Sequence, residues 1–217
     1  MMTNKTVCYI LSVKPLLEDN TFDKARSVVS DYRLKKTEKL SKKSDKALCI
    51  GAGLLIKYGL SKLGITNFGE YGTYGEKPKL YSNISYSISH SGEYVICTFS
   101  ESEVGCDVQK HKGDNLKVAK RFFSLSEQAL LKNTATDSEK ANLFYRIWCI
   151  KESYVKALGE GIKAGLSGFS VNFESNTVGT KNYCFFEYNL ADDYKCSVCK
   201  KTPTPPQFEV IELDKLL

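Results

Sequence analysis

Twice along the chain, a group of helix patterns is followed by a group of short strand patterns. An opening strand is predicted near Val7–Val13. The predicted helices lie near Thr21–Ser30, Ser44–Leu63, Asn115–Phe122, Ser126–Asn133 and Glu139–Leu158. The later strands are predicted near Ile84–Ser89, Tyr94–Ser100, Phe169–Phe173, Tyr183–Tyr188, Lys195–Cys199 and Phe208–Leu213. Because helices and strands do not alternate one by one, this order predicts an α+β fold with antiparallel strands.

The chain is long enough to bury a proper hydrophobic core. Its 217 residues are 42% hydrophobic, which suits one or two small domains. No apolar run approaches a membrane span, and Met1–Thr6 leads into a strand pattern without a signal segment. We therefore expect a cytoplasmic protein whose eight cysteines are reduced thiols.

Cys196 and Cys199 have the spacing of a zinc knuckle. No second pair of this kind exists in the sequence, and Tyr194–Lys200 alternates like a strand. In a strand, residues three apart point to opposite faces. A structural strand is therefore the favoured interpretation of this segment.

The helix pattern over Phe144–Gly159 places charged groups among bulky apolar residues. Trp148, Glu152 and Lys156 fall at i, i+4 and i+8, so they share one face of the helix. Lys151 lies about 100° around the helix axis from Glu152, at the edge of that face. An acid and two bases beside an aromatic residue indicate a site for a metal and a phosphate. The alternative is a solvated helix with an ordinary Glu152–Lys156 pair.

A second acidic motif precedes this helix. Val104–Gln109 has a strand pattern, in which Gly105 allows close backbone approach and Asp107 is expected at the strand end. An aspartate is unfavourable in a strand, which indicates a role other than packing, although a turn aspartate is the alternative. Asp107 and Glu152 could converge on a hard cation, and oxygen ligands of this kind suit Mg²⁺.

Gly105–Val108 and Trp148–Lys156 together resemble the motifs of the Sfp-type 4′-phosphopantetheinyl transferases. Asn83–Gly92 resembles the Asn-x-Ser-x-Ser-His-Ser stretch of this family, and Gly75–Pro78 resembles its Gly-Lys-Pro element. Ala119–Ser124 resembles the segment between the two acidic motifs. The likeness runs in the expected order from about residue 30 to about residue 175.

The resemblance implies a fold of two similar α+β halves packed about a pseudo-twofold, with the active site in the cleft between them. The N-terminal half would span residues 1–105 and the C-terminal half residues 106–217. The implied reaction transfers the phosphopantetheine arm of coenzyme A to a serine of an acyl or peptidyl carrier protein and releases 3′,5′-ADP. A chain that makes its own cleft is expected to be a monomer.

The resemblance also assigns residues to this reaction. Catalytic roles fall to Asp107, Glu152 and Lys156, and the Mg²⁺ ligands would be Asp107, Gln109 and Glu152. Arg33, with Lys36 as a further candidate, would contact the 3′-phosphate. The full set expected at coenzyme A comprises Arg33, Lys77, Pro78, Ser89, His90, Asp107, Lys151, Glu152 and Lys156.

Three residues have a second explanation. Gln109 stands where many family members have an acid, and its amide oxygen can ligate a metal or hold a bound water but adds no charge. Glu127 forms a capping-box pattern with Ser124, which explains it better than catalysis. His90 lies in a Ser-His-Ser-Gly pattern that could also be a tight turn.

Gly159 and Gly161 are expected to end the helix predicted near Glu139–Leu158.

The net charge of +6 leaves the partner open. Lysines gather between Lys35 and Lys46, which fits a solvated helix face, the phosphates of coenzyme A or an acidic carrier better than nucleic acid. Carrier contacts are expected in Lys110–Leu116 and Phe122–Leu131. The resemblance suggests secondary metabolism, but the residues do not choose among fatty-acid, polyketide and nonribosomal peptide carriers. A weak coenzyme A-binding module and a basic interaction protein remain as alternatives.

Overall fold

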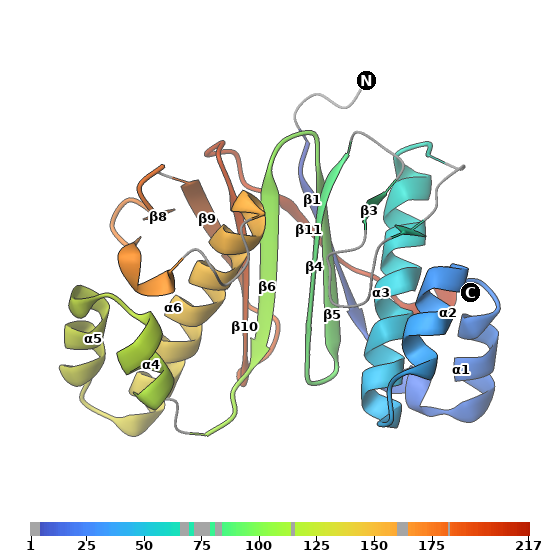
Figure 1. Cartoon of the computed structure of the whole chain (residues 1–217), viewed down its shortest axis with the longest axis horizontal. Helices are drawn as coiled ribbons and strands as arrows, with labels where there is room; N and C mark the ends of the chain where they lie inside the picture. The colour runs from blue at the N-terminus through green and yellow to red at the C-terminus, as the bar shows by residue number, and fades with distance from the viewer. Residues whose placement is uncertain are drawn as a thin grey trace. The chain divides into compact units, whose positions relative to one another are not determined.

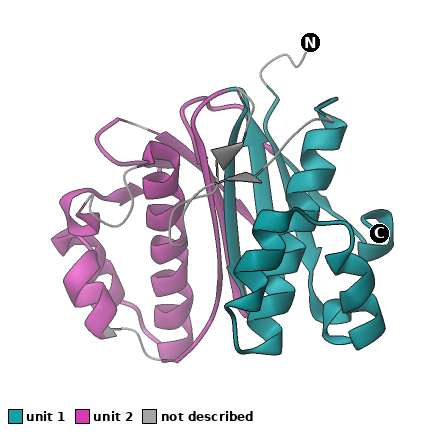
Figure 2. Ribbon diagram, turned by 45° about the vertical axis from the view of Figure 1, so that its right-hand side comes forward, with its two compact units in different colours: residues 1–101, 207–217 teal, residues 102–206 magenta. Residues whose placement is uncertain are grey.

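The computed structural model describes residues 5–65, 70–71, 79–80, 84–113, 116–159, 165–181 and 183–217. The chain divides into two compact units, coloured separately in Figure 2. Unit 1 comprises residues 1–101 and 207–217, and unit 2 comprises residues 102–206. Each unit combines helices with a mostly antiparallel sheet, so the α+β class is confirmed.

Unit 1 contains a four-stranded sheet in the order β11-β1-β5-β4, covered by the long helix α3 (Figure 1). The helices of the unit are α1 (Asp19–Arg26), α2 (Asp31–Glu38) and α3 (Lys43–Lys62), with 3₁₀ turns η1 (Lys14–Leu17) and η4 (Leu213–Lys215). The strands are β1 (Val7–Ser12), β4 (Ser85–Ser91), β5 (Tyr94–Ser100) and β11 (Gln207–Val210), with a separate pair β2 (Glu70–Tyr71) and β3 (Lys79–Leu80). The predicted hairpin of β4 and β5 is therefore confirmed.

The last strand returns to unit 1. β11 pairs in parallel with β1, from Val7 opposite Gln207 to Ile10 opposite Val210. The predicted division at residue 105 differs from these units in two ways: unit 2 begins at Ser102, and the final residues belong to unit 1. The reason for the second difference is the β1–β11 pairing, which joins the two ends of the chain and has no local sequence signal.

Unit 2 contains a five-stranded sheet in the order β6-β10-β9-β8-β7. Its strands are β6 (Val104–Lys110), β7 (Val171–Asn172), β8 (Thr177–Val178), β9 (Tyr183–Tyr188) and β10 (Tyr194–Lys200). Its helices are α4 (Leu116–Phe122), α5 (Leu125–Lys132) and α6 (Asp137–Leu158), with the 3₁₀ turn η3 (Leu166–Gly168). Helix α6 packs along β6 and β10, and its apolar residues, including Ile147, Ile150 and Tyr154, form a core with Phe123 and Phe185.

Both ends of α6 follow from local chemistry. Thr136 accepts a hydrogen bond from the Glu139 N–H, and the Glu139 carboxylate accepts one from the Thr136 N–H, which completes a capping box. Gly159 ends the helix with φ of 72°, a left-handed conformation that glycine adopts without steric cost. The predicted role of Gly159 is confirmed, whereas Gly161 lies outside the described residues.

The strand interpretation of Cys196 and Cys199 is confirmed as well. Cys196 and Cys199 lie in β10, and all eight cysteines of the chain are free thiols. Among the helices that the structure describes, none has the length and apolar character needed to cross a bilayer.

Candidate active site

A glycine sets the distance between β6 and α6. A Cβ atom added to Gly105 would lie 1.9 Å from the Ser153 carbonyl oxygen and 2.4 Å from the Ala157 amide nitrogen. Both are backbone atoms, so no rotation of a side chain could relieve the clash. Gly105 thus permits the close backbone approach that its position in the motif predicted, and the next side chain on the same face of β6 is Asp107.

Asp107 lies in the middle of β6, opposite Ser197 of β10, and not at a strand end as predicted. The strand continues to Lys110 because β10 pairs with it along its whole length. The Asp107 side chain is 2% exposed, and both oxygens accept hydrogen bonds. Lys156 Nζ donates to Oδ1 over 2.6 Å, and Gln109 Nε2 donates to Oδ2 over 2.9 Å.

Glu152 lies one turn before Lys156 on α6. Its Oε1 atom is buried, and no described residue offers it a hydrogen bond. Burial raises the pKa of Glu152, the negative charge of Asp107 raises it further, and Lys156 partly opposes both. A carboxylate oxygen that is buried without a donor is costly, so this group is suited to bind a cation or take up a proton.

The Lys156 ammonium is held by its neighbours. Burial is the largest single influence and lowers the pKa of Lys156, but the charge of Asp107, its hydrogen bond and the charges of Cys106 and Glu152 together raise it, and the net pKa is raised. Lys156 is therefore a cation at neutral pH, and its side chain remains 29% exposed. Such a group can attract the phosphate groups of a ligand.

The donor set of this site fits Mg²⁺. Asp107, Glu152 and Gln109 provide carboxylate and amide oxygens, and Mg²⁺ typically takes one or two carboxylates and completes its shell with water and substrate oxygens. The described part of the chain holds no cluster of three or more histidine, cysteine, aspartate or glutamate side chains at a metal-binding spacing.

Lys151 faces another direction. It is fully buried, and its Nζ donates to Glu127 Oε2 over 2.7 Å and to the Phe169 carbonyl over 2.6 Å. Burial lowers the pKa of Lys151, although the Glu127 charge opposes this. The Lys151 ammonium thus joins α6 to the start of α5 and to the segment before β7, whereas Glu152 beside it faces β6.

Glu127 completes the predicted capping box and does more. Its Oε2 accepts from the Ser124 N–H over 2.8 Å, which confirms the capping role. Its Oε1 accepts from the Val171 N–H over 2.9 Å. The pattern of the sequence pointed to the cap, but it carried no signal for the pairing of Glu127 with Lys151.

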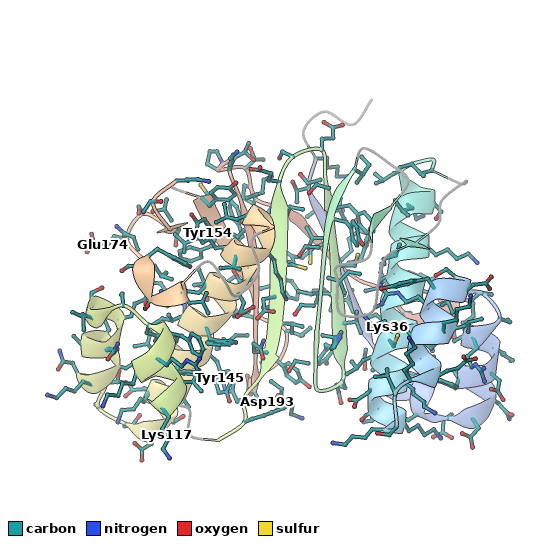
Figure 3. The ribbon with its side chains drawn as sticks, in the orientation of Figure 1. Lys36, Lys117, Tyr145, Tyr154, Glu174 and Asp193 are labelled. Carbon is teal, nitrogen blue, oxygen red and sulfur yellow. The ribbon has the colours of Figure 1, made fainter. Side chains whose placement is uncertain are left out.

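Trp148 belongs to the core of unit 2. Its ring contacts Phe122 edge-on, with centroids 5.7 Å apart, and stacks on Phe144 at 6.1 Å. Earlier on the same helix, Tyr145 (labelled in Figure 3) stacks on His111, with ring centroids 4.6 Å apart. These aromatic contacts fix the helix that carries Glu152 and Lys156.

Cys149 is a site neighbour that the sequence did not single out. Its buried thiol donates to the Asp107 carbonyl over 3.0 Å and to the Lys195 carbonyl over 3.4 Å. Burial raises the pKa of this thiol well above its usual value, so it stays protonated and can donate. The small residue after the tryptophan of the motif was the available signal for this contact.

The other predicted coenzyme contacts lie in unit 1. Ser89 is buried and His90 exposed on β4, where His90 pairs with Val95 in the ladder and not in a turn. Arg33 is a buried residue of α2, with its guanidinium 5.9 Å from the Tyr32 ring centre. Lys36 also lies on α2 (Figure 3). Lys77 and Pro78 are outside the described residues.

Comparison with known proteins identifies the family. Residues 103–199 match the model of the 4′-phosphopantetheinyl transferase superfamily. The 4′-phosphopantetheinyl transferase ffp of Bacillus subtilis is 32% identical over 221 residues, covering 94% of this chain and 96% of the relative. Another 4′-phosphopantetheinyl transferase of Bacillus subtilis is 30% identical over 198 residues, covering 83% of this chain and 86% of the relative. The enzyme gsp of Aneurinibacillus migulanus is 33% identical over 164 residues, covering 69% and 66% respectively.

The chain belongs to the 4′-phosphopantetheinyl transferase superfamily. Residues 103–199 include all of the elements that carry Asp107, Gln109, Glu152 and Lys156. The family resemblance seen in the two acidic motifs is therefore confirmed.

Proposed function

We propose that this protein transfers the 4′-phosphopantetheine arm of coenzyme A to a serine of an acyl or peptidyl carrier protein in a Mg²⁺-dependent reaction. The observation that carries the proposal is the arrangement of Asp107, Glu152 and Lys156 on β6 and α6. Family membership supports the reaction class, and the donor set supports the metal.

Asp107 and Glu152 would hold the ion, and Gln109 would contribute its amide oxygen or orient a bound water. When bound, Mg²⁺ supplies Lewis-acid stabilisation of charge on the pyrophosphate oxygens. Gln109 Nε2 now faces Asp107, so its amide would have to turn for the oxygen to serve as a ligand.

The reaction forms a bond between the serine hydroxyl oxygen and the β-phosphorus of coenzyme A. The bond from that phosphorus to the bridging oxygen breaks, and 3′,5′-ADP leaves with the electron pair. Glu152, directly or through a water, would take the serine proton, and its raised pKa suits a general base at neutral pH. Lys156 would hold the pyrophosphate and offset the charge of the leaving group.

We assign the remaining coenzyme contacts to unit 1. Arg33, Ser89 and His90 would bind the 3′-phosphate, and Lys77 and Pro78 would border the adenine. Lys151 would be a helper on α6, and the proposed reaction needs no second subunit. Lys151 would then act through the packing of α6, because its ammonium is fully buried.

Intact-mass spectrometry tests the proposal. An apo carrier protein incubated with this chain, coenzyme A and Mg²⁺ is expected to gain the mass of one phosphopantetheine group, and EDTA is expected to abolish the gain. A panel of acyl and peptidyl carriers covers the open choice of partner. If every carrier keeps its apo mass while coenzyme A still binds, the transferase proposal fails in favour of a coenzyme A-binding module.

A further inference from the structure

The Asp107 carboxylate has a hydrogen-bond donor on each oxygen. Lys156 Nζ donates to Oδ1 over 2.6 Å and Gln109 Nε2 to Oδ2 over 2.9 Å. Any cation that is to bind Asp107 must therefore compete with one of these donors. The amide of Gln109 is neutral and can turn about its own bonds, whereas Lys156 carries a full positive charge.

Lys156 is the mobile partner of this pair. Its side chain is 29% exposed, whereas the Asp107 side chain is 2% exposed in the centre of β6. A lysine ammonium is carried by a flexible four-carbon stem, and a strand residue in a full ladder is fixed. When the pair separates, the ammonium is the group that moves.

A divalent cation at Asp107 Oδ1 and the Lys156 ammonium at its present position exclude one another. Both would lie within a few ångströms of the same oxygen, where like charges repel strongly because the site is largely buried. The Glu152 carboxylate differs from that of Asp107, because its Oε1 is buried and no described residue donates a hydrogen bond to it. The site is thus open to a cation at Glu152 Oε1, and Lys156 blocks a cation from Asp107 Oδ1.

We propose that Lys156 couples the binding of the divalent cation to the binding of a pyrophosphate. A pyrophosphate draws the ammonium away from Asp107 Oδ1 and so frees this oxygen as a metal ligand. Because such coupling is reciprocal, the cation strengthens pyrophosphate binding by the same factor. This inference rests on the proposed function, and it assigns Lys156 a second role as an internal competitor of the metal.

Titration of the whole chain with Mn²⁺, followed by the electron paramagnetic resonance signal of the free ion, tests the competition without coenzyme A. Lys156→Met, which keeps the length of the side chain but not its charge, is expected to bind Mn²⁺ at least about fivefold tighter than wild type. Lys156→Arg, which keeps the charge, is expected to stay within about twofold of wild type. Lys140→Met, on the same helix and with a side chain that is 28% exposed, serves as the matched control.

The coupling itself is measured by repeating the titration with coenzyme A, corrected for Mn²⁺ bound to coenzyme A alone. Saturating coenzyme A is expected to tighten Mn²⁺ binding in both proteins, because its phosphate oxygens complete the metal shell, but by a factor at least about fivefold larger in wild type than in Lys156→Met. Circular dichroism establishes that each variant is folded.

Equal Mn²⁺ affinity of folded Lys156→Met and wild type overturns the inference, and so does tight binding by Lys156→Arg. These outcomes leave the proposed function intact when wild type still modifies a carrier protein. If wild type neither binds coenzyme A nor modifies any carrier, the proposed function fails instead. The Mn²⁺ comparison without coenzyme A remains valid in that case, so the two failures are distinguishable.

Discussion

The two long helices, α3 in unit 1 and α6 in unit 2, each pack closely against a strand, but the glycine that permits the contact lies on a different element in each unit. In unit 1 the glycine lies on the helix: a Cβ atom on Gly59 would be 2.1 Å from the Phe99 ring of β5. In unit 2 the glycine lies on the strand, and a Cβ atom on Gly105 would meet the backbone of α6. The space beside the glycine is filled by the Phe99 side chain in unit 1, whereas in unit 2 it is filled by the backbone of α6.

The difference extends to what the helices carry. α3 buries an almost continuous apolar surface, including Leu54, Leu55, Ile56 and Leu60, in the core of unit 1. α6 buries the ammonium of Lys151 and places Glu152 and Lys156 near β6. Close backbone approach allows short polar contacts between helix and strand, and the helix with this geometry is the one to which we assign the proposed chemistry.

The largest expected effect concerns the buried pair of α6. Lys151→Met leaves the Glu127 carboxylate buried without its charged partner, and removing one partner of such a pair costs about 3–5 kcal/mol of unfolding free energy. Urea denaturation measures the loss, and Lys140→Met, whose Asp137 partner is exposed, is expected to change it by less than about 0.5 kcal/mol. Equal stability of Lys151→Met and wild type would contradict a structural role for the pair.

The two glycines test the comparison directly. Gly105→Ala is expected to cost about 3 kcal/mol and to reduce transfer to the carrier, because the backbones of β6 and α6 must separate and move Asp107 from Lys156. Gly59→Ala forces only the Phe99 ring to shift and is expected to cost about 1–3 kcal/mol with little loss of activity in the folded fraction. Urea denaturation and carrier modification measured together separate the two cases.

A smaller free-energy change, but a large functional one, is expected for Glu152→Gln. Carrier modification should fall at least about 100-fold, since the variant loses both a metal ligand and a base. Its stability should not fall, because the buried Oε1 has no donor to lose among the described residues. Glu174→Gln, in the turn between β7 and β8, is the matched control. Full activity of Glu152→Gln would overturn the assignment of the site.

The smallest effect is expected for Gln109→Glu. A third carboxylate should tighten Mn²⁺ binding by about tenfold or less, because phosphate oxygens supply much of the affinity of Mg²⁺-type sites. Gln207→Glu adds the same charge in unit 1 and should leave the Mn²⁺ affinity unchanged. Unaltered binding in Gln109→Glu would place residue 109 outside the metal shell.

Much of the fold was predictable because it follows local patterns. The apolar run of α3, the β4–β5 hairpin and the alternation of β10 each lie within one segment. The errors arose where partners are distant. Asp107 was placed at a strand end because the polar run after Gln109 looks like a turn, but pairing with β10 extends β6 to Lys110. The parallel pairing of β11 with β1 was missed for the same reason.

The sequence by itself determined the family, the order of the elements and the side chains available for chemistry, because motif spacing and periodicity are local properties. Only the tertiary structure decided which groups meet. Lys151 and Glu152 are neighbours in the sequence, yet successive helix residues differ in direction by about 100°. Lys151 therefore pairs with Glu127, 24 residues away, whereas the negative charge of Asp107 on β6 acts on Glu152.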